Sequence, residues 1–151
     1  MILGIDPGST TIGYAFLSGT KQIPTIHDYG VILTSKDATI SEKLVQLGSD
    51  LQELIDLHKP TKAVVEDLFF ATNVTTAVIV AQSRGVILYI LEKNGIPHSK
   101  FTPLQVKQSV TGYGKANKRQ VQEIITKLLK LKEIPKPDDA ADALALAWIV
   151  L

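Results

Sequence analysis

The sequence contains no cysteine, and no uninterrupted apolar stretch reaches the roughly 18 residues that a membrane-spanning helix needs. The absence of cysteine excludes a disulfide framework and is compatible with the cytoplasm. Residues 1–6 include no basic side chain and end on an acid, which argues against a secretory signal. We therefore expect one cytoplasmic domain over residues 1–151, with a core of its own and no membrane association.

The charge of the chain is balanced overall but unevenly distributed. The formal net charge is +1. Between His98 and Pro137 lie nine lysine and arginine residues and only two glutamates, so this segment has an excess of seven positive charges and the rest of the chain is acidic. Such a segment is typical of phosphate binding, although lysines on a solvated helix face would give the same pattern.

The hydrophobic pattern predicts an α/β domain with a mixed five-stranded sheet and helices on both faces. Thr39 and Glu42 form a capping-box pattern before one helix, and Thr102-Pro103 opens another. A long apolar helix is expected from Asn73 to the Asn94-Gly95 stop signal, and Asp138 is expected to cap the last helix. The predicted strands are Met1–Ile5, Ile12–Leu17, Ile26–Thr34, Lys62–Glu66 and Ile96–Phe101.

Four carboxylates lie at the edges of these core elements. Asp6 follows the first strand, Glu66 ends a strand of alanine and valine, and Asp139 and Asp142 lie near the start of the last helix. Each has a structural alternative: Asp6 suits a turn before Pro-Gly, and acids at a helix start favour the helix dipole. If the four converge, their mutual repulsion calls for a divalent cation, and such a site is suited to phosphodiester cleavage.

The spacing of the last two acids favours convergence. Asp139 and Asp142 are three residues apart, so they share one helix face. Ala140, Ala141 and Ala143 flank them, and small side chains let this helix approach the sheet closely. We therefore expect both carboxylates to lie over Asp6.

Several motifs, in order along nearly the whole chain, resemble the RuvC family of Holliday-junction resolvases. The first and last of these motifs are specific together and weak alone. The motifs are Gly4-Ile5-Asp6-Pro7-Gly8-Ser9, Glu66 with Phe69, Gln82-Ser83-Arg84-Gly85, Gln105-Val106-Lys107-Gln108, Lys118 with Gln120-Val121-Gln122, and Asp139-Ala140-Ala141-Asp142-Ala143-Leu144.

The resemblance implies an RNase H-like fold and a crossover junction endodeoxyribonuclease. Asp6, Glu66, Asp139 and Asp142 match the family's catalytic carboxylates, which would hold two Mg²⁺ ions per site, with Mn²⁺ able to substitute. The expected reaction is two-metal hydrolysis, with ions about 3.5–4 Å apart, leaving 5′-phosphate and 3′-hydroxyl ends. Paired symmetric nicks would then resolve a four-way junction.

The resemblance also implies residues that contact DNA. Lys107 and Lys118 match basic residues that the family uses near the active site, and Lys115 and Arg119 flank Lys118 and widen the patch. Phe69 matches an aromatic residue suited to stacking on an unpaired base. Without the resemblance, the lysines would be ordinary exposed helix residues and Phe69 a loop anchor.

The helix starting near Asn73 carries more apolar residues than one packed face requires. The resemblance implies a homodimer through this helix, whose two-fold symmetry would match that of a four-way junction. It also raises a RuvAB branch-migration complex as a further partner.

Three other functions are compatible with parts of the sequence. A YqgF-type nuclease acting on RNA would share the metal site, but Glu66-Asp67-Leu68-Phe69 and Lys107 favour the resolvase. An actin- or Hsp70-like ATPase would explain the phosphate-loop character of residues 6–10, yet it needs two such domains. A non-catalytic junction-binding module would not need all four carboxylates.

Overall fold

The computed structural model describes residues 1–67 and 74–151, and this part of the chain forms five strands and five helices. The strands are β1 (Ile2–Asp6), β2 (Thr11–Gly19), β3 (Pro24–Leu33), β4 (Lys62–Glu66) and β5 (His98–Phe101). The helices are α1 (Ile40–His58), α2 (Val74–Lys93), α3 (Pro103–Thr111), α4 (Lys118–Leu128) and α5 (Asp138–Ile149).

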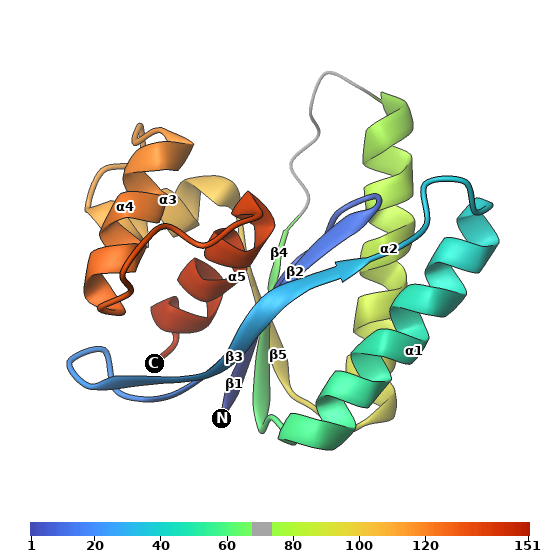
Figure 1. Ribbon diagram of the computed structural model, residues 1–151, viewed down its shortest axis with the longest axis horizontal. Helices are drawn as coiled ribbons and strands as arrows, with labels where there is room; N and C mark the ends of the chain where they lie inside the picture. The colour runs from blue at the N-terminus through green and yellow to red at the C-terminus, as the bar shows by residue number, and fades with distance from the viewer. Residues whose placement is uncertain (68–73) are drawn as a thin grey trace.

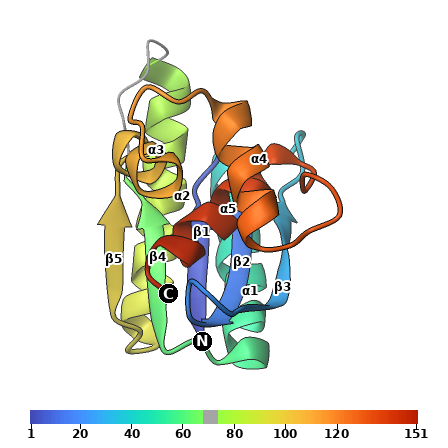
Figure 2. The same cartoon turned by 90° about the vertical axis from the view of Figure 1, so that its left-hand side faces the viewer.

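The strands form one mixed sheet in the order β3-β2-β1-β4-β5. The first three strands are antiparallel neighbours, whereas β4 runs parallel to both β1 and β5. Helices α1 and α2 cover one face, and α3, α4 and α5 lie on the other (Figures 1 and 2). The predicted α/β class, with a mixed five-stranded sheet between helices, is confirmed.

The local start signals of the helices are mostly confirmed. Thr39 and Thr102 each accept a backbone hydrogen bond within a complete capping box. The prediction that Asp138 caps α5 is wrong, because Pro137 occupies the cap position and Asp138 is already the first helical residue. The proline leaves α5 without a side-chain cap, since it has no hydroxyl or carboxylate to accept a hydrogen bond. The predicted cap Asn73 lies outside the described residues.

Side chains alternate across the sheet and so build two separate cores. Leu3, Ile5 and Phe16 point toward α1 and α2, where they meet Leu47 and Leu91. Their neighbours on the same strands point the other way, toward α5. The core beneath α5 includes Ala15, Leu17, Val64, Ala143, Leu144 and Trp148.

Helix α5 lies unusually close to the sheet because glycine and alanine meet there. A Cβ atom added to Gly4 would lie 2.2 Å from the Ala143 carbonyl oxygen, and one added to Gly13 would lie 2.0 Å from the Asp139 carbonyl oxygen. Neither strand residue can therefore carry a side chain while the helix stays in place. The expected close approach of the alanine-flanked helix is confirmed.

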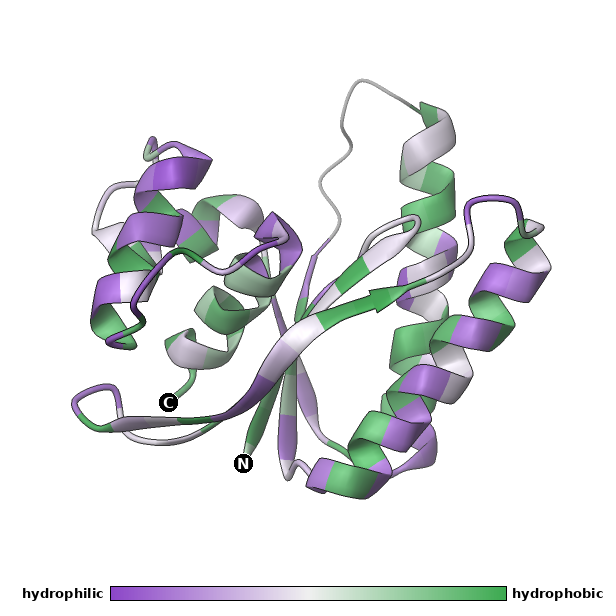
Figure 3. Ribbon diagram, in the orientation of Figure 1, coloured by the Kyte–Doolittle hydropathy of each residue, from purple (hydrophilic) through white to green (hydrophobic). Residues whose placement is uncertain are grey.

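Helix α2 packs differently, with one narrow buried face and an exposed apolar remainder. Ile87 and Leu91 are fully buried, whereas the exposed fractions of Val78 and Tyr89 are 52% and 64%. Hydrophobic residues recur along the whole helix (Figure 3). By length and composition α2 could cross a membrane, although polar residues interrupt its apolar sequence. A core helix can pass the same test, so the expectation of no membrane association stays a prediction.

Candidate acidic site with a basic rim

Two of the four carboxylates meet where neighbouring parallel strands end. Asp6 is the last residue of β1 and Glu66 the last of β4, and the pairing of Ile5 with Val65 places them side by side. Ile5 and Val65 are buried on the α1 and α2 side, so strand alternation turns both acids toward α5. Asp6 and Glu66 lie close enough for each carboxyl group to affect the pKa of the other.

The other two carboxylates reach this point from the first turns of α5. Its contact with Gly13 places the start of the helix over β2, next to β1. Asp139 and Asp142 both lie close enough to Asp6 to raise its pKa by repulsion. These interactions with Asp6 place the four predicted carboxylates in one region of the structure, while their roles stay predictions.

The pKa values of the clustered carboxyl groups are raised, which indicates an excess of negative charge. Burial, followed by repulsion from Glu66, Asp142 and Asp139, raises the pKa of Asp6 to about 9. Burial and the Asp142 charge raise the pKa of Glu66 to about 7. Burial also raises the pKa of Asp142, although Lys118 opposes this shift. Burial and mutual repulsion thus oppose full ionisation of the cluster in the absence of a cation.

The chemistry of the site fits a hard divalent cation. Its ligand atoms are carboxylate oxygens, which Mg²⁺ and Mn²⁺ prefer, and the raised pKa values mark negative charge that a cation would offset. Asp142 is turned toward Lys118, with 2.8 Å between Oδ2 and Nζ. Within residues 1–67 and 74–151, no three histidine, cysteine or acidic side chains form a preassembled metal cage. Binding of a cation therefore requires these carboxylates to rotate toward it.

A pocket of about 280 Å³ opens beside the carboxylates and carries basic side chains on its rim. Lys107 from α3 and Lys118 from α4 both line it, so the structure brings these two predicted DNA-binding residues to the acidic site. Between them the wall is apolar. The lining residues are Glu66, Pro103, Val106, Lys107, Lys118, Val121 and Asp142.

Two further predicted DNA-binding residues, Lys115 and Arg119, are not among the residues that line this pocket. Lys115 is exposed in the loop before α4. Arg119 is also exposed, and its Nε donates to Glu123 Oε1 over 2.8 Å. Phe69 lies outside the described residues, so its predicted stacking role is untested.

The structure also contains an ion-pair cluster that no sequence motif assigned to a role. Asp67, directly after Glu66, contacts both Arg84 of α2 and Lys100 of β5. Strand alternation could have predicted that Asp67 faces away from Glu66, because two consecutive residues at a strand end point to opposite faces. The Asp67 side chain therefore faces away from the acidic site and adds no charge to it.

The chain resembles known proteins along almost its entire length. The family model described as crossover junction endodeoxyribonuclease RuvC matches residues 2–149. The chain belongs to the RuvC family of crossover junction endodeoxyribonucleases. A RuvC protein from Petrotoga mobilis is 49% identical over 148 residues, covering 98% of this chain and 91% of the relative. One from Fusobacterium nucleatum subsp. nucleatum is 48% identical over 145 residues, covering 96% and 76%.

Solved RuvC structures confirm the predicted RNase H-like fold. The structure of T. thermophilus RuvC in complex with Holliday junction substrate superimposes with a TM-score of 0.91 at 30% identity, covering 98% of this chain and 90% of that one. The yeast mitochondrial Holliday junction resolvase Ydc2 shares the fold, with a TM-score of 0.68 at 20% identity. The RuvC-type interpretation of the sequence motifs is confirmed, while the roles of single residues stay predictions.

Proposed function

We propose that this RuvC-family chain resolves four-way DNA junctions by hydrolysing one phosphodiester bond in each of two opposing strands. The observation that carries the proposal is the convergence of Asp6, Glu66, Asp139 and Asp142 beside a pocket rimmed by Lys107 and Lys118. The T. thermophilus relative at 30% identity was solved with a Holliday junction, which supports the choice of substrate.

In this proposal the four carboxylates hold two Mg²⁺ ions, and Mn²⁺ substitutes for them. The bound ions supply an activated water and stabilise charge on the leaving 3′ oxygen. Asp6 and Glu66 would hold such ions as carboxylates, so ion binding would release any proton that the pair carries. The water oxygen bonds to phosphorus as the bond to the 3′ oxygen breaks, leaving 5′-phosphate and 3′-hydroxyl ends.

The lysines bind and orient the substrate strand. Lys107 and Lys118 line the same pocket as Glu66 and Asp142, so a phosphate drawn to both ammonium groups lies next to the carboxylates. Lys118 also holds Asp142 through the 2.8 Å ion pair. Lys115 and Arg119 extend the positive surface beyond the pocket, and Phe69 remains the proposed stacking residue.

Paired nicks need two sites related by two-fold symmetry, and α2 is the surface we propose for the dimer. Val74, Val78 and Tyr89 expose 74%, 52% and 64% of their surface on this helix. A contiguous exposed apolar face is typical of a protein interface. The cytoplasm is the proposed location, and contact with a RuvAB complex stays a prediction from the resemblance.

The test is cleavage of a labelled synthetic four-way junction in Mg²⁺ or Mn²⁺, beside a linear duplex and an RNA–DNA hybrid. We expect paired symmetric nicks in the junction, and their loss in Asp6→Asn. Asp56→Asn on α1, across the sheet from the site, is the matched control and should cut normally. Cutting of the hybrid instead would indicate an RNA-directed nuclease, and tight junction binding without cutting by the parent would indicate a binding module.

A further inference from the structure

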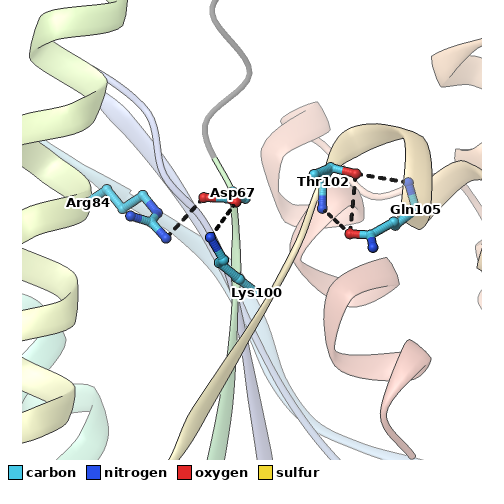
Figure 4. Close-up of polar contacts among 5 residues, drawn as sticks. All are labelled: Asp67, Arg84, Lys100, Thr102 and Gln105. Carbon is cyan, nitrogen blue, oxygen red and sulfur yellow. Dashed lines mark hydrogen bonds and ion pairs between the residues drawn. The ribbon is translucent and has the colours of Figure 1, made fainter.

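Asp67 is the carboxylate directly after Glu66, and it lies on the opposite side of the sheet. Its Oδ1 is 3.1 Å from Arg84 Nη2, and its Oδ2 is 3.0 Å from Lys100 Nζ. Figure 4 shows Asp67 between the two cationic groups, one from α2 and one from β5. Each carboxylate oxygen therefore faces a different element.

The backbone of Asp67 is fixed as well. Its N–H donates to the Phe101 carbonyl oxygen over 2.8 Å, one step beyond the last paired residue of β4. Side chain and main chain together tie the end of β4 to both α2 and β5. The capping box of Thr102 and Gln105 follows immediately on β5 and fixes the start of α3 beside it (Figure 4).

Partial burial makes the Asp67–Arg84 pair more than a surface ion pair, whereas Lys100 is 66% exposed and pairs with Asp67 at the surface. The exposed side-chain fractions are 23% for Asp67 and 18% for Arg84. Water and salt screen such a pair less than an exposed one. Within the described residues the Arg84 Nε atom is buried without a hydrogen-bond partner, and Nη2 is paired with Asp67.

We infer that Asp67 is a positioning residue that holds the Glu66 carboxylate in the acidic cluster by anchoring the end of β4 to Arg84 and Lys100. The inference rests on the proposed function of that cluster. Glu66 has Asp6 on one side and the anchored Asp67 on the other, so its main chain cannot shift without breaking the anchor. A displacement of about 1 Å at a catalytic group can cost about 100-fold in rate.

The variants separate anchoring from simple stability. Asp67→Asn removes the charge and leaves Arg84 partly buried without its counter-ion, so it should lower the unfolding temperature. The double variant Asp67→Asn with Arg84→Gln removes both charges and should recover the unfolding temperature, but the anchor remains lost. Asp67→Glu keeps a carboxylate and is the conservative variant. Asp28→Asn, which removes a carboxylate oxygen 3.3 Å from His58 Nε2 and away from the acidic site, is the matched control.

Three quantities are measured for each variant: the unfolding temperature, the affinity for Mn²⁺ without DNA by electron paramagnetic resonance, and the single-turnover rate of junction cleavage. Asp67→Asn should weaken Mn²⁺ binding about tenfold and slow cleavage about 10- to 100-fold. In the double variant both losses should persist despite recovered stability. Asp67→Glu should stay within about threefold of the parent, and Asp28→Asn should match it.

Recovery of Mn²⁺ affinity in the double variant, or parental Mn²⁺ affinity in folded Asp67→Asn, would overturn the inference. So would tighter junction binding by Asp67→Asn together with weaker binding by Arg84→Gln, because Arg84 and Lys100 would then serve the DNA directly. If Asp67→Asn does not fold, the double variant and Lys100→Gln decide by the same Mn²⁺ measurement. A parent that binds Mn²⁺ but cuts no junction would refute the proposed function alone.

Discussion

The two faces of the sheet are covered by helices of similar hydrophobicity that pack at different closeness. Helix α5 is pressed onto β1 and β2 through Gly4 and Gly13, and every residue from Ala143 to Ile149 is buried. Helix α2 rests on larger side chains, such as Leu3 and Ile5, and leaves much of its apolar surface exposed. The close contact of α5 places its carboxylates next to the ends of β1 and β4. The looser contact of α2 leaves an apolar surface exposed for a partner.

The two faces also differ in how their acidic side chains are neutralised. The α5 face holds acidic groups whose pKa values are raised by burial and mutual repulsion. The α2 face receives Asp67 with two cations already beside it. Consecutive acids at the end of β4 thus enter two different environments. Glu66 joins a cluster of acids in which Lys118 offsets only part of the negative charge, whereas Asp67 is matched by two cations. Only the first environment is suited to recruiting a metal ion.

The largest effect is expected from matched Gly→Ala substitutions on the two faces. Gly13→Ala places a Cβ atom against the Asp139 backbone, so it should lower the free energy of unfolding by about 3 kcal/mol and slow cleavage. Gly85→Ala on α2 meets nothing within 4 Å and should raise it by up to about 1 kcal/mol through helix propensity. Urea denaturation measures both. Equal effects at the two positions would contradict the difference in packing.

The next effect concerns the pH dependence of the metal-free protein. The folded pKa of Asp6, about 9, lies above its ordinary value, so the folded state binds more protons than the unfolded state from about pH 4 to about pH 9. Stability should therefore fall as pH rises through this range. Burial and Asp28 raise the pKa of Tyr14 on the other face, but above 10, outside this range.

Denaturant unfolding at several pH values measures this decline. Asp6→Asn should flatten it, and saturating Mg²⁺ should offset it, since cation binding favours the ionised carboxylates. Asp56→Asn should leave the decline unchanged. A metal-free parent whose stability does not vary with pH would show that the acids are not crowded as the structure places them.

A third effect tests the exposed face of α2. Val78→Glu adds a charge to a side chain that is 52% exposed, so the monomer should fold normally while the dimer weakens by about 100-fold. Leu57→Glu on α1, at a residue 73% exposed, should not change the dimer. Sedimentation equilibrium distinguishes the two, and a Val78→Glu dimer of parental affinity would place the interface elsewhere.

The smallest effect compares a lysine beside the acidic site, Lys107, with one at the opposite end of the sheet, Lys62. Lys107→Gln should reduce the dependence of log affinity on log salt by about 1, as expected for one lost phosphate contact. Lys62→Gln, at the end of β4 opposite to Glu66, should leave this slope unchanged. Junction binding in Ca²⁺ at several salt concentrations is the measurement. Equal slopes for Lys107→Gln and the parent would show that Lys107 does not contact a DNA phosphate.

Much of this architecture follows from sequence patterns that act locally. Alternation and helical periodicity predicted the strands and helices, and capping boxes at Thr39 and Thr102 placed two helix starts correctly. The spacing of Asp139 and Asp142, with alanines around them, predicted their shared face. The prediction that Asp138 caps α5 was wrong because Pro137 takes the cap position, a choice that depends on how the preceding segment enters the helix.

The sequence by itself determined which carboxylates stand at element ends and which face of each element they share, because both follow from periods of 2 and 3.6 residues. Only the tertiary structure decided that burial and neighbouring acids raise the pKa of Asp6, that Lys118 pairs with Asp142, and that Asp67 joins Arg84 and Lys100. Burial, repulsion and ion pairing depend on distances between residues far apart in the chain, and those distances exist only once β1, β4, α2, α4 and α5 have packed together.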